Sequence, residues 1–420
     1  MPPKHSVNLD ILRGLLALIV VIAHLNAFPT HFDKNFGKLF SVYYNFPGGI
    51  SVLGFFILSG YVIGLNHPEL SDKKMIKSYI KKRLIRIVPI YFVAIIFTAL
   101  ITWGDYSWKL ILSNLFFVSV PLGNILDEAF PLWSLHYELF CYTLFIFVSY
   151  FKLGLARTLK VLLIVTVILF LFFHKVRVHP LFITYLIGFI FWITGAMLAQ
   201  IKTFPYWNIS ASRMISIFLL MFCLQNLNPY GPILKVLHFS TVDYSGYIWY
   251  QAKILYPDLF FYPLTILFIL SLTHSYSKTY KFLIYFLFIA ATLRLFMLVR
   301  VYGFNYLIQE HYVIPVTVLI ISILFWLLNF QINGKAKKII KSLASLSAIS
   351  YAMYIIHLPI MNLFGKIVTT SIFYFIIKFI AFWVVLFIVC YFLELKFQPF
   401  IKKLFRGKST ANTSVKVRAD

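Results

Sequence analysis

Residues 181–200 read LFITYLIGFIFWITGAMLAQ, an apolar stretch that contains no Asp, Glu, Lys, Arg or His. At a rise of about 1.5 Å per residue, a helix of this length crosses the hydrocarbon core of a bilayer, which is about 30 Å thick. A segment that is apolar on every face of a helix is typical of a membrane span. The stretch therefore predicts a transmembrane helix.

Comparable stretches recur along nearly the whole chain. Of its 420 residues 61% are hydrophobic and 12% are charged, which is far from the balance of a soluble domain. We therefore predict an all-α, polytopic transmembrane helical bundle of about 10–12 spans, forming one membrane domain over residues 1–395. A basic cytoplasmic tail, residues 396–420, follows and is expected to be partly disordered. The candidate spans are residues 11–29, 49–65, 84–103, 135–151, 159–173, 181–200, 213–225, 259–273, 282–298, 311–330, 347–364 and 371–393, and residues 110–122 are expected to form a short re-entrant or interfacial piece.

The formal net charge of +25 would suit a nucleic-acid partner if the positive side chains lay on one soluble face. Instead they concentrate in short connections between apolar spans, where the positive-inside rule makes them markers of the cytoplasmic side. We therefore expect no nucleic-acid partner, both termini in the cytoplasm, and a multi-pass protein of the cell (inner) membrane. The second connection is the most basic, with Lys73, Lys74, Lys77, Lys81, Lys82, Arg83 and Arg86.

The three cysteines, Cys141, Cys223 and Cys390, all fall inside predicted spans. Their spacing matches neither a disulfide framework nor a metal site. We expect them to be small apolar packing residues, and we expect no metal.

Ionisable side chains inside spans are costly, so each is a candidate for function. Arg13 and His24 share the first span and lie about 16 Å apart along its axis, with the arginine near the cytoplasmic surface. A histidine at this depth either takes part in chemistry or bonds a neighbouring carbonyl as a contact between helices. Glu138 lies at the outer end of the fourth span, at a depth that overlaps with that of His24. It is either an interfacial carboxylate or a partner that raises the basicity of the imidazole and fixes its tautomer.

Two further features stand out in the third and eleventh spans. Arg83 and Arg86 lie three residues apart and so share a helical face, which suits paired recognition of phosphate oxygens. Anchoring at the membrane surface by snorkelling also explains arginines at this position. For His357, a structural role in which it and the tyrosines Tyr351 and Tyr354 form hydrogen bonds between helices is as well supported as a catalytic one.

Five segments, taken in order, resemble the membrane-bound acyltransferase family 3, whose members are similar to polysaccharide and sugar O-acetyltransferases. Each segment alone is a weak signal, and the five together are specific. The resemblance runs from about residue 9 to residue 393. The segments are Leu9-Asp10-x-x-Arg13 followed by His24, Phe55-Phe56-Ile57-Leu58-Ser59-Gly60-Tyr61, Arg83-x-x-Arg86-Ile87-x-Pro89-x-Tyr91, Trp133-Ser134-Leu135-x-x-Glu138, and Ser350-Tyr351 through Tyr354 and His357 to Pro359.

The chain departs from the family pattern in two places. Leu139 stands where many members carry a second acid, which leaves Glu138 as the single acid of its segment. In the family, the last helix usually ends with a Glu that is shortly followed by a Pro. Here Glu394 and Pro399 lie further apart than in that pattern, so we assign no role to either residue.

The resemblance implies transfer of an acyl group, most often acetyl, from acyl-coenzyme A to a hydroxyl of a sugar, often on a cell-surface glycan or its lipid-linked precursor. Acyl-coenzyme A, acetyl-CoA in the commonest case, is then a donor substrate, and no permanently bound cofactor is expected. The partners are this donor, the sugar or glycan acceptor and the lipid bilayer.

A mechanism follows from the resemblance and from the expected depths. Arg13, Arg83 and Arg86 would hold the anionic nucleotide end of the donor at a basic cytoplasmic mouth. His24 would act as general base on the acceptor hydroxyl, with Glu138 orienting it. A transient acyl-histidine is the alternative, since a histidine can also serve as nucleophile. Supporting or structural roles are expected for Asp10, Ser59, Trp133, Ser134, Tyr351, Tyr354 and His357.

Two functions other than an enzyme are also compatible with these residues: a transporter and a non-catalytic scaffold. A transporter or flippase for a lipid-linked glycan would also place histidines, acids and arginines along its pathway, although no internal repeat is visible in the chain. A non-catalytic scaffold would have little use for ionisable groups in four separate spans.

Overall fold

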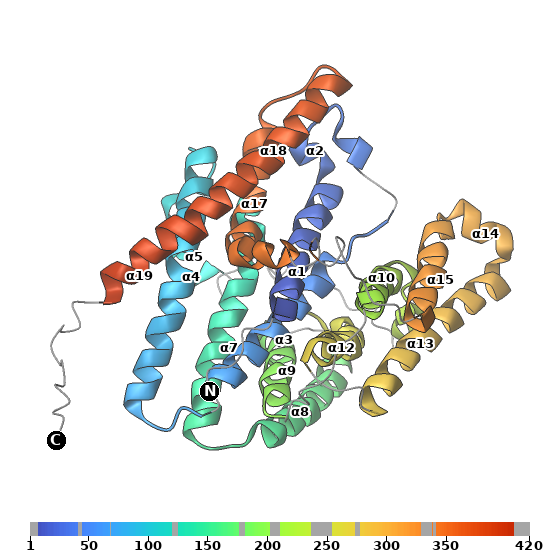
Figure 1. The fold of residues 1–420 in the computed structure, drawn as a ribbon, viewed down its shortest axis with the longest axis horizontal. Helices are drawn as coiled ribbons and strands as arrows, with labels where there is room; N and C mark the ends of the chain where they lie inside the picture. Colours follow the sequence, from blue (N-terminus) through green and yellow to red (C-terminus); the bar gives the residue numbers. More distant parts are fainter. Residues whose placement is uncertain are drawn as a thin grey trace, which may run out of the picture.

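The computed structural model describes residues 7–40, 44–67, 69–119, 125–175, 181–201, 211–236, 254–273, 278–328, 338 and 342–406. Every regular element within these ranges is a helix, as Figure 1 shows. Among the described residues, 10 helices are long and apolar enough to cross a membrane, and two shorter apolar helices accompany them. The predicted polytopic helical bundle is therefore confirmed.

Each of the candidate spans coincides with a helix. These helices are α1 (Val7–Ala27), α3 (Gly48–Asn66), α4 (Lys73–Ile101), α7 (Trp133–Tyr150), α8 (Leu155–Lys175), α9 (Leu181–Ala199), α10 (Ala211–Leu227), α12 (Tyr262–Thr273), α13 (Lys278–Tyr302), α15 (Val313–Leu328), α17 (Ser350–Gly365) and α18 (Ile372–Phe392). Shorter pieces connect them: α2 (Pro29–Phe32), α5 (Trp108–Leu115), α11 (Gly231–Val236), α14 (Phe304–Gln309), α19 (Gln398–Arg406), the 3-10 turns η1 (Gly37–Phe40), η2 (Asp127–Leu132), η4 (Tyr256–Phe261) and η5 (Leu343–Ile349), and the π turn η6 (Leu393–Phe397).

The segment between α4 and η2, where a re-entrant or interfacial piece is expected, contains α5. This helix has 8 residues, which is about 12 Å and too short to cross the bilayer. Ser107 caps it by accepting a hydrogen bond from the Leu110 N–H. Residues 120–122 of the expected piece lie outside the described residues.

The predicted boundary between the membrane domain and the tail falls inside η6, through which α18 continues directly into α19. The first part of the tail is thus helical. The remainder, residues 407–420, lies outside the described residues.

Helices α3 and α9 approach each other so closely that only glycine fits at their crossing. A Cβ atom on Gly60 would lie 1.8 Å from the carbonyl oxygen of Trp192, and one on Gly195 would lie 1.9 Å from that of Ile57. Gly60 and Gly64 form the small-xxx-small spacing that lets transmembrane helices pack backbone to backbone. The neighbouring Ser59 is consequently held on a rigid pair of helices.

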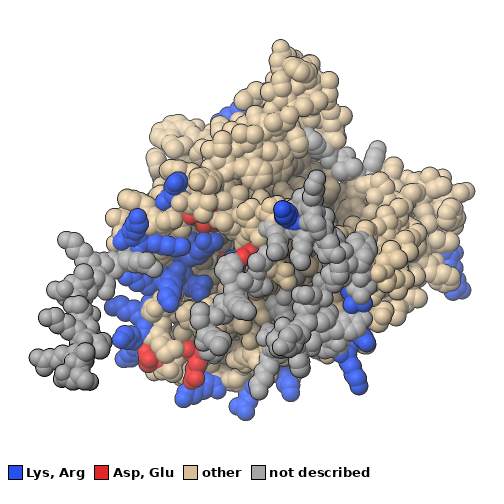
Figure 2. All heavy atoms as spheres, viewed as in Figure 1, with Lys and Arg blue, Asp and Glu red and all other residues tan. Residues whose placement is uncertain are grey.

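The N-terminal turns of α4 carry the basic connection. The Asp72 side chain caps the helix by accepting a hydrogen bond of 2.7 Å from the Met75 N–H. The following lysines are exposed, and the helix becomes apolar only after Arg83. In the view of Figure 2, Lys and Arg side chains gather over this part of the molecule, whereas the region of α18 is almost free of them. The two ends of the bundle therefore differ in charge, as the positive-inside rule requires of a membrane protein.

The helices that carry the five segments of the family resemblance meet at the centre of the bundle. Helix α1 packs against α3, α17 and η5, and α17 packs against α4, η2 and α18. Helices α10, α13 and α15 pack with one another and form a separate group at one side (Figure 1). The candidate site residues all come from the central group or its flanking turns.

Candidate functional site

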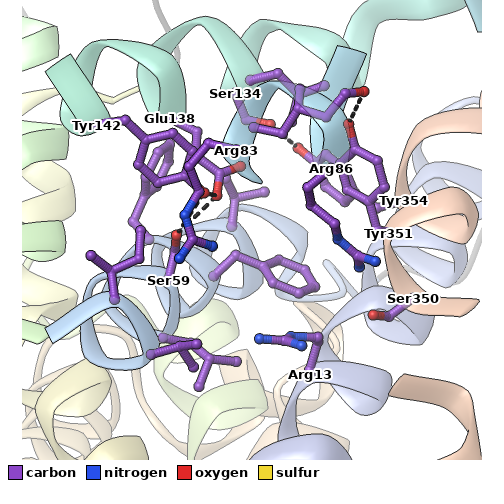
Figure 3. Close-up of a pocket in the computed structure, with 18 residues that line it drawn as sticks. Arg13, Ser59, Arg83, Arg86, Ser134, Glu138, Tyr142, Ser350, Tyr351 and Tyr354 are labelled. Carbon is purple, nitrogen blue, oxygen red and sulfur yellow. Dashed lines mark hydrogen bonds between the residues drawn. The ribbon is translucent and has the colours of Figure 1, made fainter. Parts of the chain in front are cut away.

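A pocket of about 240 Å³ lies where α1, α3, α4, α7 and α17 meet, and we call it the inner pocket because it lies toward the basic connections. Its lining includes Arg13 from α1 and both Arg83 and Arg86 from α4. Figure 3 shows the three guanidinium groups pointing into the same space from different sides. The structure thus brings together the three arginines that the sequence singled out. Their convergence makes the pocket a candidate site for an anion.

Glu138 lines the same pocket and is held in place by hydroxyl groups. Ser59 Oγ donates to Glu138 Oε1 at 2.9 Å, and the Tyr142 hydroxyl donates to the same oxygen (Figure 3). These contacts link α3 and α7 within the inner pocket. A carboxylate that lines the same pocket as three arginines offsets part of their mutual repulsion.

Arg86 makes a two-pronged ion pair with Glu394, which lies in the turn η6 after the last long helix. The Arg86 nitrogens lie 3.0 and 3.4 Å from the two carboxylate oxygens, and the Glu394 side chain is only 2% exposed. The backbone N–H of Ala352 donates to Glu394 as well, at 3.3 Å. The guanidinium carbon also lies 5.2 Å from the ring centre of Tyr351. Arg86 is therefore fixed in direction from two sides.

Arg83 is held differently, by aromatic rings. Its guanidinium carbon lies 5.6 Å from the ring centre of Tyr79 and 5.7 Å from that of Tyr142. Its Nε atom is buried without a hydrogen-bond partner in the part of the chain that the structure describes. Arg83 thus keeps donor capacity for a ligand.

His67, which follows the last residue of α3 and lies outside the spans, is a further titratable group near Arg83. Burial, together with the nearby Arg83 and Lys82, lowers the pKa of His67 to about 4, so this histidine adds no charge at neutral pH.

A second pocket, of about 280 Å³, lies beyond the first, and we call it the outer pocket. It is lined by His24 of α1, Trp133 at the start of α7 and Asp258 of η4, together with the amide side chains of Asn26 and Asn45. An imidazole, an indole face, a carboxylate and two amides are groups that can bind and activate a polar hydroxyl compound.

His24 lies beside His357 at the edge of the outer pocket. The His24 Nδ1 and His357 Nε2 atoms are 2.7 Å apart, and the two rings are inclined by only 9°. His357 Nδ1 lies 3.0 Å from the carbonyl oxygen of Met353, which can only accept. In the neutral pair, His357 therefore donates from Nδ1 and accepts at Nε2, and His24 donates from Nδ1. This tautomer leaves the lone pair of His24 on Nε2, as a general base needs.

The expected contact between His24 and Glu138 does not occur among the described contacts. Glu138 lies in the inner pocket with the arginines, and His24 lies in the outer pocket with His357. Both residues occur at similar depth in the sequence-based scheme, but depth does not specify the direction in which a side chain leaves its helix. In the described contacts, the side chain that meets a ring nitrogen of His24 is that of His357.

The remaining candidates divide between the two pockets. Ser134 and Tyr351 line the inner pocket, Trp133 lines the outer one, and Tyr354 lines both. The Tyr351 hydroxyl donates to the carbonyl of Ile87 at 2.8 Å, a contact between α17 and α4.

Asp10 supports the cytoplasmic end of α1. It accepts a hydrogen bond of 2.9 Å from Ser347 in η5, which ties the start of the first helix to the turn before α17.

Three residues of these pockets were missed in the sequence. Tyr142, Glu394 and Asp258 lie in or beside them, and none of the three was assigned a role. Glu394 carried a usable signal, because a carboxylate at the end of an apolar run is itself a functional candidate. For Tyr142 the signal was its spacing of four residues from Glu138, which places both on one helical face.

The three cysteines are buried free thiols, as expected for packing residues.

Comparison with known protein families supports the chemistry that these pockets suggest. A family model described as an acyltransferase domain, that of acyltransferase family 3, matches residues 6–231. The matched segment contains Arg13, His24, Arg83, Arg86 and Glu138. Comparisons with curated proteins and with solved structures give no match.

Proposed function

The chain belongs to acyltransferase family 3, and from this premise we propose that it transfers an acyl group, acetyl in the first instance, from cytoplasmic acyl-coenzyme A to a hydroxyl of a sugar. The acceptor is a cell-surface glycan or its lipid-linked precursor, and the membrane is the cell (inner) membrane. The main support is the pairing of an arginine-lined inner pocket with a histidine-containing outer pocket that it adjoins. One pocket suits the anionic donor and the other a neutral hydroxyl compound.

The donor pocket of this proposal uses the three arginines as phosphate ligands. Guanidinium groups bind phosphate oxygens in a bidentate manner, and Arg13, Arg83 and Arg86 present theirs to one space. Glu138 then acts in this pocket, by holding the guanidinium groups in position, and not as the partner of His24. The thioester end of the donor extends from the arginines toward the outer pocket.

The reaction takes place at His24. His24 Nε2 removes the proton of the sugar hydroxyl while its oxygen attacks the thioester carbonyl carbon. The C–O bond forms, the C–S bond breaks, and the departing thiolate takes the proton back from His24. His357 holds the tautomer of His24 by accepting a hydrogen bond from its Nδ1, and this bond stabilises the positive charge that develops on His24, the role of the third member of a catalytic triad.

Mass spectrometry of surface glycans from cells with and without this chain tests the proposal. The mass difference identifies the acyl group, and fragmentation locates it. In complemented cells, His24→Ala and Glu138→Gln at normal protein levels are expected to remove the acyl group while the glycan itself is still exported. Survival of acylation in both variants would refute the enzymatic scheme, and loss of export of the whole glycan would indicate a transporter.

Single-turnover trapping separates direct transfer from an acyl-histidine intermediate. Purified protein is mixed with acyl-labelled donor in the absence of acceptor and quenched. Direct transfer predicts no covalently labelled protein, whereas the relay predicts a label that disappears in His24→Ala.

A further inference from the structure

The inner and outer pockets meet at a wall formed by two side chains. Among the described residues that line the pockets, Val52 of α3 and Tyr354 of α17 are the two that line both. They are 7% and 7% exposed, so each is almost fully packed. We call this pair the partition. A group that extends from the arginines of the inner pocket toward the outer pocket meets the partition where the two linings join.

Tyr354 is held in place by its hydroxyl group. The hydroxyl donates to Ser134 Oγ at 2.8 Å (Figure 3). It also donates toward the carbonyl oxygen of Pro131, at 3.1 Å. Both acceptors belong to the junction of η2 and α7. The ring is therefore tied at its far end to a different helix from the one that carries it, and it cannot swing aside without losing these bonds.

Two rings pack against Tyr354. Phe55 of α3 lies edge-on to its ring, with the ring centres 5.6 Å apart. His357, one turn further along α17, lies with its ring centre 6.5 Å away. Protein interiors packed in this way have little room for added methylene groups, and inserting them forces strain.

We propose that the partition, Val52 and Tyr354, sets the length of the acyl group and restricts the enzyme to short acyl chains of about the size of acetyl. This inference rests on the proposed function. The donor reaches the partition from the inner pocket with its acyl group leading, so the acyl carbons meet Val52 and Tyr354 before the thioester carbonyl comes within reach of a hydroxyl held at His24. An acetyl group adds one methyl there, whereas a longer chain meets the tied ring.

The test is a competition between acyl-coenzyme A donors of two, four and eight acyl carbons, with the full chain reconstituted in liposomes. The readout is the ratio of kcat/KM for the butyryl and acetyl donors, for the wild type, Tyr354→Ala and Tyr354→Phe. We expect Tyr354→Ala to raise this ratio by at least about tenfold, because a methylene against a pocket wall is worth that factor or more. Tyr354→Phe keeps the ring and is expected to raise the ratio much less.

Two further variants keep the test decisive. Val52→Ala enlarges the partition from the other side and is expected to raise the same ratio if Tyr354→Ala does not fold. Phe382→Ala removes a fully buried ring that packs against Phe32 and Phe364, away from both pockets, and is expected to lower stability without changing the ratio.

The outcomes separate the two proposals. One outcome is a wild type that transfers acetyl while the active variants of Val52 and Tyr354 keep its ratio of kcat/KM for the butyryl and acetyl donors. That result refutes the role of the partition in chain length and leaves the proposed function standing. A wild type that already prefers the longer donors overturns the partition as well. A folded wild type that transfers no acyl group from any of these donors overturns the proposed function and with it this inference.

Discussion

His24 Nδ1 lies 2.7 Å from His357 Nε2, and His357 in turn lies 3.0 Å from the carbonyl oxygen of Met353 through its other ring nitrogen. These contacts connect α1, the first of the twelve candidate spans, to α17, the eleventh, across 333 residues of sequence. In the neutral pair, the Met353 carbonyl oxygen accepts a hydrogen bond from His357 Nδ1, and His357 Nε2 then accepts one from His24 Nδ1. His357 is thus a positioning residue for His24.

The histidine pair predicts a large and non-additive loss of activity. His357→Ala removes the acceptor that fixes the tautomer of His24, so we expect kcat to fall by about 10²- to 10⁴-fold, with a small change in KM for the donor. His24→Ala is expected to lose at least as much. The double variant should then be no worse than His24→Ala alone, because the two residues act as one unit. Initial rates in proteoliposomes measure this, and fully multiplicative losses would mean that His357 acts independently of His24.

The ion pair of Arg86 and Glu394 predicts an effect on donor binding. Glu394→Ala frees the guanidinium group from its bidentate partner, and we expect KM for the acyl donor to rise by about tenfold, the worth of one charge-assisted hydrogen bond. Arg86→Ala is expected to raise KM at least as much. In the Arg86→Ala background, adding Glu394→Gln should change KM no further. An unchanged KM in Glu394→Ala would show that Arg86 does not depend on this carboxylate.

The same pair predicts a difference in stability. Arg86→Ala leaves the Glu394 carboxylate, 2% exposed, without its ion-pair partner, which is unfavourable in a buried site. We expect its melting temperature in detergent to fall, and Arg86→Ala combined with Glu394→Gln to recover part of the loss. A double variant that melts below the single variant would contradict this account.

A buried ion pair outside both pockets predicts a purely structural defect. Asp33 lies 2.9 Å from Lys378 Nζ and 2.9 Å from Thr369 Oγ1, and both charged side chains are almost fully buried. Asp33→Asn leaves the lysine without its counter-charge, so we expect a loss of about 3–5 kcal/mol in the free energy of unfolding. Chemical denaturation in detergent measures it. Asp33→Asn combined with Lys378→Met should recover part of the loss, and an undiminished loss in the double variant would speak against the pair.

The pH dependence of that defect follows from the pKa of Asp33. Burial favours the neutral carboxyl, but hydrogen bonds from the Phe36 N–H, Lys378 and Thr369 outweigh it and hold the pKa below its ordinary value. A carboxyl with a lowered pKa stabilises the fold above its unfolded pKa of about 3.9, and this contribution is lost as pH falls through the folded value. The difference between wild type and Asp33→Asn should therefore be constant near neutral pH and shrink only in strong acid.

The glycine crossing of α3 and α9 predicts intolerance of the smallest side chain. A Cβ on Gly60 would lie 1.8 Å from a backbone oxygen that cannot move without shifting its helix. Gly60→Ala is therefore expected to lower the yield of monodisperse protein in size-exclusion chromatography. Leu65→Ala, on the same helix at a position 36% exposed, is the matched control and should behave as the wild type. Equal yields would show that the two helices can separate at little cost.

Much of the site was predictable, residue by residue, because each candidate stands out against an apolar background. Arg13, Arg83 and Arg86 were expected at one basic mouth and they share one pocket. The expected contact of Glu138 with His24 is not among the described contacts, because two residues on different helices at similar depth can point into different cavities. Tyr142 and Glu394, which hold Glu138 and Arg86, gave weaker signals because their importance depends on a neighbour far away in the chain or around the helix.

The sequence by itself determined the spans, the charged end of the bundle and the acyltransferase family. Each of these depends on one segment at a time, because the free-energy cost of inserting a side chain into a bilayer depends on that side chain and its depth and not on distant segments. Only the tertiary structure decided which ionisable groups meet. The choice of His357 over Glu138 as the partner of His24, and the division of the site at Val52 and Tyr354, depend on how the helices rotate and cross. Helix rotation is set by packing between segments distant in sequence, such as the contact of Gly60 with Trp192.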